Sequence, residues 1–160
     1  MRAIVTGSFD PITLGHIEII KKARMFFDEL YVVALINKDK SYMFSLEEKK
    51  EIMELSLADM ENVVIDAYEG LTADYMHEHG ITKIVRGVRN DSDMKYEKEL
   101  SQAMKGFDKD FETIFIESDE SFSKISSTRV RELIAKGKSL DGFVSENAKE
   151  RIIEIYNFKG

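Results

Sequence analysis

Short apolar runs alternate along this chain with stretches in which apolar side chains recur every three or four residues. The first pattern is typical of strands buried in a sheet, and the second of amphipathic helices. The apolar runs predict strands over residues 2–6, 30–36, 63–67, 81–85 and 112–116. The helical pattern predicts helices over about 13–27, 45–57, 71–79, 92–105, 126–137 and 145–156. This order predicts an α/β fold, a doubly wound five-stranded parallel sheet with helices on both faces and further helices at the C-terminus.

Local signals mark where several of these helices begin and end. Thr13 and Ser126 are suitable N-caps, and Ser45 with Glu48 forms a capping box. Gly80 is placed to end the third helix. The fourth helix is expected to present one apolar face, formed by Tyr96, Leu100, Ala103 and Met104.

Ligands of doubly wound sheets bind beyond the carboxyl ends of the strands, at the point where the strand order reverses. Polar candidates follow every predicted strand of this chain. They are Ser8 and His16, Lys40, residues 70–72, Arg86 and Arg89, and residues 123–128. We read residues 86–91 as a polar loop after the fourth strand. Five such segments at one edge of a sheet predict a binding site there.

Composition narrows the class of protein. The 160 residues are expected to form a single domain, 1–160, and the absence of cysteine is compatible with a reducing cytoplasm. The net charge of −7 argues against non-specific binding to nucleic acid, and no apolar run is long enough to span a membrane. Any anionic ligand must therefore be held by a local cluster of cations.

Two segments have the pattern of an anion site at a helix N-terminus. In the first, a strand ends at Gly7 and a helix begins with His16 in its first turn, so backbone N–H groups and the helix dipole point to one place. In the second, Ile125 precedes Ser126, Ser127 and Thr128. At the first segment, a histidine that only forms hydrogen bonds within the helix start would be ordinary. At the second, a single serine is enough for capping, and three hydroxyls exceed that need. The presence of two such segments favours phosphate binding.

Two other candidates depend on their position. Arg86 and Arg89 flank Gly87, which allows close approach of a ligand, and two arginines suit separate phosphate groups. A solvated charged turn would explain the same residues if they lay elsewhere. His77 and His79 face different ways on a short helix, so we expect no metal site there, and no residue is assigned to metal binding.

The segment Gly-Ser-Phe-Asp-Pro-Ile-Thr-Leu-Gly-His, residues 7–16, resembles the T/H-x-G-H signature of the nucleotidyltransferase superfamily. The stretches 43–48, 86–97 and 125–131 narrow the resemblance to the phosphopantetheine adenylyltransferase family. The resemblance covers essentially the whole chain and implies a homo-hexamer, with coenzyme A as a possible feedback ligand. It also implies residue roles. Catalysis falls to His16, Lys40 and Ser8. The acceptor is expected to contact Ser8, Lys40, Thr72 and Arg86. ATP is expected to contact Ser8, Phe9, His16, Gly87, Val88, Arg89, Glu97, Phe122, Ser123, Lys124, Ile125, Ser126, Ser127 and Thr128.

Three positions depart from the pattern of the family. Many members have tryptophan where Phe122 stands, threonine where Ser8 stands, and a larger apolar residue where Thr72 stands. Serine keeps the hydroxyl group and phenylalanine keeps an apolar ring, so Thr72 has the weakest of these assignments.

No general base stands among the candidates. A phosphate monoester needs none, because its second pKa is about 6 and it is ionised near neutral pH. With the substrates that the resemblance implies, we predict that 4′-phosphopantetheine attacks the α-phosphate of ATP without a base from the protein, giving dephospho-coenzyme A and pyrophosphate, with Mg²⁺ accompanying ATP. The alternatives are a transferase acting on nicotinate or nicotinamide mononucleotide or on glycerol phosphate, and a non-catalytic sensor of adenine nucleotides.

Overall fold

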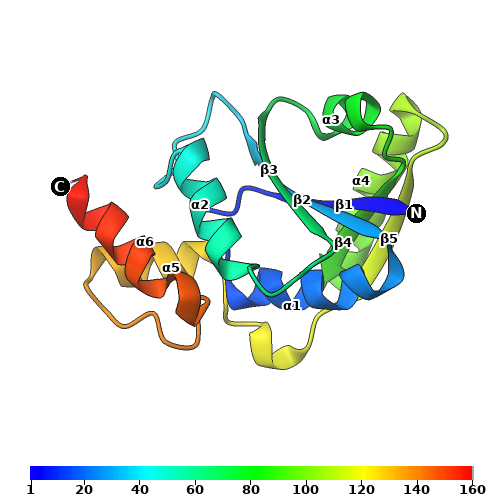
Figure 1. The fold of residues 1–160 in the computed structure, drawn as a ribbon. Helices are drawn as coiled ribbons and strands as arrows, with labels where there is room; N and C mark the ends of the chain where they lie inside the picture. Colours follow the sequence, from blue (N-terminus) through cyan, green and yellow to red (C-terminus); the bar gives the residue numbers. More distant parts are fainter. Residues whose placement is uncertain (160) are drawn as a thin grey trace.

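Five parallel strands form one sheet, in the order β3-β2-β1-β4-β5 (Figure 1). This computed structural model describes residues 1–159 apart from the side chains of Asp91 and Phe107. The strands are β1 (Arg2–Gly7), β2 (Glu29–Ile36), β3 (Val63–Glu69), β4 (Lys83–Val88) and β5 (Glu112–Glu117). The predicted doubly wound sheet is confirmed. Its strand order reverses between β1 and β4, which places the expected site at their carboxyl ends.

Helices cover both faces of the sheet (Figure 1). They are α1 (Leu14–Ala23), α2 (Leu46–Ser56), α3 (Thr72–His79), α4 (Asp91–Phe107), α5 (Ser127–Ala135) and α6 (Glu146–Phe158), with short 3-10 helices η1 (Arg24–Phe26) and η2 (Glu120–Phe122). Ala3 and Val5 of β1 face a core that α1, α2, α5 and α6 share, whereas Ile4 faces the core under α3 and α4. The period of two along a strand therefore divides one apolar run between two layers.

The predicted caps are present. Thr13 caps α1 and forms a capping box with His16, Ser45 and Glu48 form the box of α2, and Ser126 caps α5. Gly80 ends α3 with φ 64°, a left-handed conformation that glycine adopts without strain. Among the described residues, none of the helices combines the length and the apolar character of a membrane span.

Several boundaries differ from the prediction, and two of the differences concern the site and the core. Residues 86–88 were expected in a loop, but they continue β4 and pair with β5, so that prediction was wrong for this part. The α1 helix ends at Ala23 and a 3-10 turn follows, so Phe27 lies outside the helix although its side chain is buried. Arg86 and Gly87 carry a loop-like sequence, and only the neighbouring strand gives them their backbone partners.

The apolar residues of α4 share one face of the helix, as expected, but most of that face is exposed. Tyr96 is 61% exposed, Leu100 and Ala103 are also exposed, and only Met104 of the expected set packs against the core. The half-buried row of α4 instead includes Glu97, whose carboxylate meets Arg86 of β4. The face of α4 turned to the sheet therefore includes a charged residue, and most of its richest apolar face is turned outward.

Candidate active site

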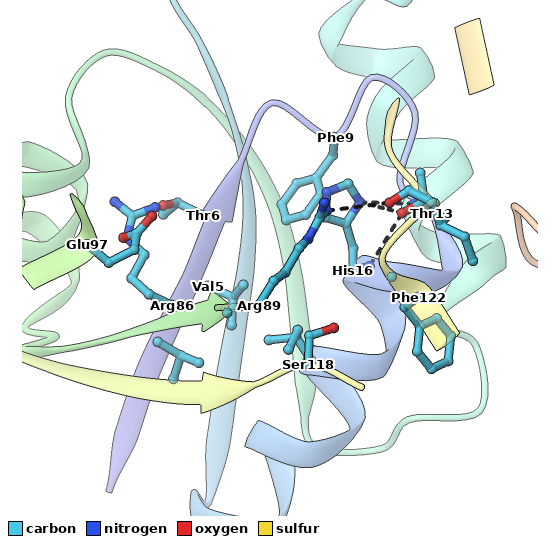
Figure 2. A pocket seen from close by; sticks show the side chains of 15 residues that line it. Val5, Thr6, Phe9, Thr13, His16, Arg86, Arg89, Glu97, Ser118 and Phe122 are labelled. Atoms are coloured by element: carbon cyan, nitrogen blue, oxygen red, sulfur yellow. Dashed lines mark hydrogen bonds and ion pairs between the residues drawn. The ribbon is translucent and has the colours of Figure 1, made fainter. Parts of the chain in front are cut away.

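Two adjoining cavities open at the carboxyl ends of β1 and β4. The first, of about 200 Å³, lies between the end of β1, the start of α1, the end of β4 and the segment 118–125 (Figure 2). The second, of about 240 Å³, lies between the ends of β1 and β2 and the start of α3. Thr6 and Arg86 line both cavities, so these two residues mark the boundary between them.

The cavities separate the predicted site residues into two groups. The first cavity is lined by the predicted nucleotide residues Phe9, His16, Gly87, Arg89, Glu97, Phe122 and Ile125. The second is lined by all four predicted acceptor residues, Ser8, Lys40, Thr72 and Arg86. The grouping that the resemblance implied thus appears as two separate spaces that meet at Arg86.

Hydrogen bonds fix the tautomer and orientation of His16. The Thr13 backbone N–H donates to Nδ1 of His16 at 3.0 Å, so Nδ1 is an acceptor and Nε2 carries the ring proton. The Phe9 ring packs edge-on against the imidazole, with centroids 5.0 Å apart (Figure 2). Burial, and after it the charge of Arg89, lowers the pKa of His16 to about 4. His16 is therefore a neutral hydrogen-bond donor at pH 7 rather than a cation or a base.

The two arginines occupy different positions. Arg89 runs beside the His16 ring and donates weakly to the carbonyl oxygens of Ser123 and Ile125, at 3.4 and 3.5 Å (Figure 2). Arg86 lies next to Glu97, with Nε 3.5 Å from a carboxylate oxygen. Arg89 thus ties the end of β4 to the segment before α5, whereas Arg86 is held between the cavities.

The three hydroxyls at the start of α5 all have partners within the protein. Ser126 Oγ accepts from the Arg129 N–H, Ser127 Oγ donates to the Pro11 carbonyl at 2.8 Å, and Thr128 Oγ1 accepts from the Arg131 guanidinium. Only Ser126 caps the helix, but the other two hydroxyls also have partners within the protein, so the number of hydroxyls is not by itself a sign of phosphate binding. What α5 offers an anion is the pair of backbone N–H groups at 127 and 128, which have no acceptor within the helix.

Gly87 is required for a reason that the sequence did not show. A Cβ at this position would lie 2.9 Å from Cγ1 of Ile19 on α1, so glycine lets α1 pack closely against β4. Val88 is buried and its carbonyl accepts from Ser118, and its side chain lines neither cavity. The remaining predicted residues that line neither cavity are Ser123, Lys124, Ser126, Ser127 and Thr128.

Sequence reasoning missed Asp10, Thr6 and Ser118. Asp10 is buried, and its carboxylate accepts from the backbone N–H groups of Met43 and Phe44, each at 2.9 Å, so it joins the turn after β1 to the segment before α2. An acidic residue followed by proline in a glycine turn was the available signal. Thr6 and Ser118 line the first cavity but have no distinguishing sequence context.

The residues at this site do not fit a resident metal ion. Within residues 1–159, the side chain of Asp91 left aside, no three histidine, aspartate or glutamate side chains gather in a way that could hold one. His77 instead pairs with Asp108 at 2.8 Å, and His79 stacks on Tyr75. We therefore assign no metal ligand.

Comparison with known proteins agrees with the motifs. A family model described as cytidylyltransferase-like matches residues 4–133. The phosphopantetheine adenylyltransferase of Thermotoga neapolitana is 40% identical over 154 residues, covering 96% of each chain. Those of Clostridium novyi and Shouchella clausii are 38% and 36% identical and cover at least 94% of each chain. The chain belongs to the phosphopantetheine adenylyltransferase family. The resemblance predicted from the motifs is thereby confirmed.

A solved structure attributed to a nicotinate-nucleotide adenylyltransferase of Vibrio parahaemolyticus superimposes with a TM-score of 0.64 and covers 95% of this chain and 97% of its own. At 19% identity it supports the fold alone. The roles of single residues within this family fold stay predictions, for which the two cavities supply the geometry.

Proposed function

We propose that this chain transfers the adenylyl group of ATP to 4′-phosphopantetheine, giving dephospho-coenzyme A and pyrophosphate. The observation that carries the proposal is the pair of cavities meeting at Thr6 and Arg86. Each cavity holds cationic side chains, and the two are close enough for substrates in them to react at the shared wall. Family membership supplies the identity of the two substrates.

The reaction needs no base from the protein. A phosphate oxygen of 4′-phosphopantetheine, ionised because its second pKa is about 6, forms a bond to the α-phosphorus of ATP. The bond from that phosphorus to the bridging oxygen breaks, and pyrophosphate leaves with the electron pair. Catalysis then rests on placing two anions in line and stabilising the charge that develops.

The site residues divide this work. His16 donates from Nε2 to an oxygen on the α-phosphorus, which its neutral form and fixed tautomer allow. Ser8 and Lys40 orient the reacting oxygens, and Arg86 holds the acceptor phosphate. Arg89 holds the phosphates of ATP in the first cavity, and the N–H groups of residues 127 and 128, which line neither cavity, are proposed to meet phosphate oxygens that extend past it. Mg²⁺ is expected to arrive with ATP, held by substrate oxygens and water, and we assign no step to it.

The direct test is incubation of the protein with ATP and 4′-phosphopantetheine, with detection of dephospho-coenzyme A and pyrophosphate. Parallel reactions offer nicotinate or nicotinamide mononucleotide with ATP, and glycerol phosphate with CTP. Product from another acceptor alone would replace the proposed substrate. ATP binding by folded protein without any product would favour a sensor and overturn the proposal.

Matched lysines test the second cavity. Lys40 lines it, whereas Lys38 on the same loop points to Glu69, 3.7 Å away, outside the cavity. We expect Lys40→Met to lower kcat/KM for the acceptor by about 100-fold, with Lys38→Met within about twofold of wild type. Equal effects of the two substitutions would contradict the assignment of Lys40.

Variants at the histidines test the first cavity. His16→Ala should lower kcat by about 100-fold or more while ATP affinity changes little, since the donor acts chiefly on the transition state. His77→Ala, on the far helix α3, is the control. Equal losses of turnover and ATP affinity in His16→Ala would make His16 a binding residue only.

We also propose that the chain assembles into a homo-oligomer, a hexamer by family resemblance. It is expected to act in the cytoplasm, with coenzyme A as a feedback ligand. The exposed Tyr96 and Leu100 on α4 are the surface that supports assembly. Analytical ultracentrifugation should give a mass above the monomer, reduced by Tyr96→Ser with Leu100→Ser and unchanged by Phe158→Ser. A monomer at all concentrations would overturn the assembly, and initial rates unaffected by coenzyme A would overturn the feedback.

A further inference from the structure

Lys49 on α2 is a buried lysine that neither cavity uses. Its side chain is 0% exposed, and Nζ has no hydrogen-bond partner in the part of the chain that the structure describes. Burying an ammonium group costs several kcal/mol unless other groups compensate it. Burial lowers the pKa of Lys49, the Asp10 carboxylate opposes that change, and the charge of Arg131 adds to it. The buried ammonium group of Lys49 therefore needs a compensating contact within the protein.

The compensating contact is the ring of Tyr42. Nζ of Lys49 lies 3.7 Å from the ring centroid, well inside the distance for a cation–π interaction, and the contact is desolvated, which strengthens it. Tyr42 is also part of the wall of the second cavity. Lys49 thus lies directly behind a side chain that shapes the proposed acceptor site.

Tyr42 in turn holds the loop that carries Lys40. Its hydroxyl oxygen accepts from the Asn37 backbone N–H at 3.0 Å. Asn37 builds the turn, since its side-chain oxygen accepts from the Asp39 N–H and its carbonyl from the Lys40 N–H, at 3.0 and 3.1 Å. Asn37 and Lys40 both line the second cavity. An unbroken series of contacts therefore joins the buried ammonium of Lys49 to the turn at Lys40, along the connection between β2 and α2 (Figure 1).

We propose that Lys49 is a positioning residue for the acceptor site, acting through the Tyr42 ring to fix the wall of the second cavity and the turn that presents Lys40. It touches neither substrate. The catalytic consequence rests on the proposed function, whereas the ordering of the loop does not. The two can therefore be measured separately.

The first measurement is kinetic. Lys49→Met keeps the length of the side chain and removes the charge, and we expect it to lower kcat/KM for 4′-phosphopantetheine about tenfold through KM, with KM for ATP within about twofold. Lys49→Arg keeps a cation and should recover most of the loss. Lys138→Met, the same change at an exposed lysine, should match wild type.

The second measurement needs no substrate. Amide hydrogen exchange of residues 37–42 should speed up in Lys49→Met and in Tyr42→Leu, and no further in the double variant, while Lys49→Arg stays near wild type. Tyr42→Leu tests the contact from its half-buried side, so the proposal can still be judged if Lys49→Met does not fold.

The outcomes are distinct. Exchange at 37–42 unchanged in Lys49→Met and Tyr42→Leu, or additive effects in the double variant, would overturn the proposal. So would Lys49→Arg behaving as Lys49→Met does. If wild type makes no dephospho-coenzyme A, the proposed function fails, and the exchange data alone decide whether Lys49 orders the loop.

Discussion

Acidification should reveal the neutral state of His16, whose side chain is half-buried. The pKa of this group falls from 6.5 to about 4 on folding, chiefly through burial. That difference corresponds to about 3 kcal/mol between its two protonation states. Its unfolded form binds a proton near pH 6.5, but the native form resists protonation until near pH 4. The contribution of neutral His16 to the free energy of unfolding is therefore fully present above pH 6.5, and it is lost progressively as the pH falls to about 4.

The assay is urea unfolding of wild type and His16→Gln at several pH values. At pH 5, His16 should lower the free energy of unfolding of wild type by about 2 kcal/mol relative to pH 7.5. In His16→Gln this loss should be absent, because glutamine does not titrate. Carboxyl groups that protonate at low pH affect both proteins alike, so the difference between them isolates His16. The variant His77→Gln, at an exposed histidine, serves as the matched control.

Titration of the imidazole signals by NMR measures the same quantity directly. The signal absent from His16→Gln should titrate near pH 4, and Arg89→Met should raise that pKa, since the Arg89 charge is the second cause of its depression. A midpoint near 6.5, or parallel pH dependence in wild type and His16→Gln, would refute the reasoning. The proposal that Nε2 of His16 acts as a neutral hydrogen-bond donor would then be unsupported.

Three further predictions concern stability measured by urea unfolding. Gly87→Ala places a Cβ 2.9 Å from Ile19 and should destabilise the protein by about 2 kcal/mol. Gly106→Ala, in open space on a helix, should stabilise it by about 0.5–1 kcal/mol. Effects of the same sign would contradict the packing argument. Asp10→Asn removes a buried carboxylate that accepts two backbone N–H groups and lies 3.7 Å from the half-buried guanidinium of Arg131, and should cost about 3 kcal/mol. A loss under about 1 kcal/mol would show that the carboxylate is dispensable. Ser126→Ala removes a helix cap and should cost about 1 kcal/mol, with Ser126→Asp near wild type; equal losses would mean that capping is not its role.

Local features of the fold were readable from the sequence. The capping box at Ser45 and Glu48, and Gly80 at the end of α3, involve neighbours within four residues, so the sequence contains both partners. The apolar runs of β1 and β2 predicted buried strands because both faces of those strands are covered. The motif of residues 7–16 predicted the superfamily, the stretches 43–48, 86–97 and 125–131 narrowed it to the family, and relatives across almost the whole chain confirm it.

Other features depended on distant partners. Arg86 and Gly87 looked like a loop, and pairing with Phe115 and Ile116 of β5 makes them a strand. The apolar residues of α4 lie on one face, but the face turned to the sheet carries Glu97, which pairs with Arg86 of β4. In each case the deciding atom lies ten or more residues away, beyond what a local pattern can contain.

The sequence by itself determined the strand–helix order, the caps and the membership of a nucleotidyltransferase family, because these follow from periodicity and from short motifs. Only the tertiary structure decided that the predicted ligand residues fall into two cavities meeting at Arg86. It also decided that the hydroxyls of α5 are already engaged, that His16 is neutral, and that Lys49 lies under Tyr42. Burial and contact between distant segments set these properties, and they exist only once the chain has folded.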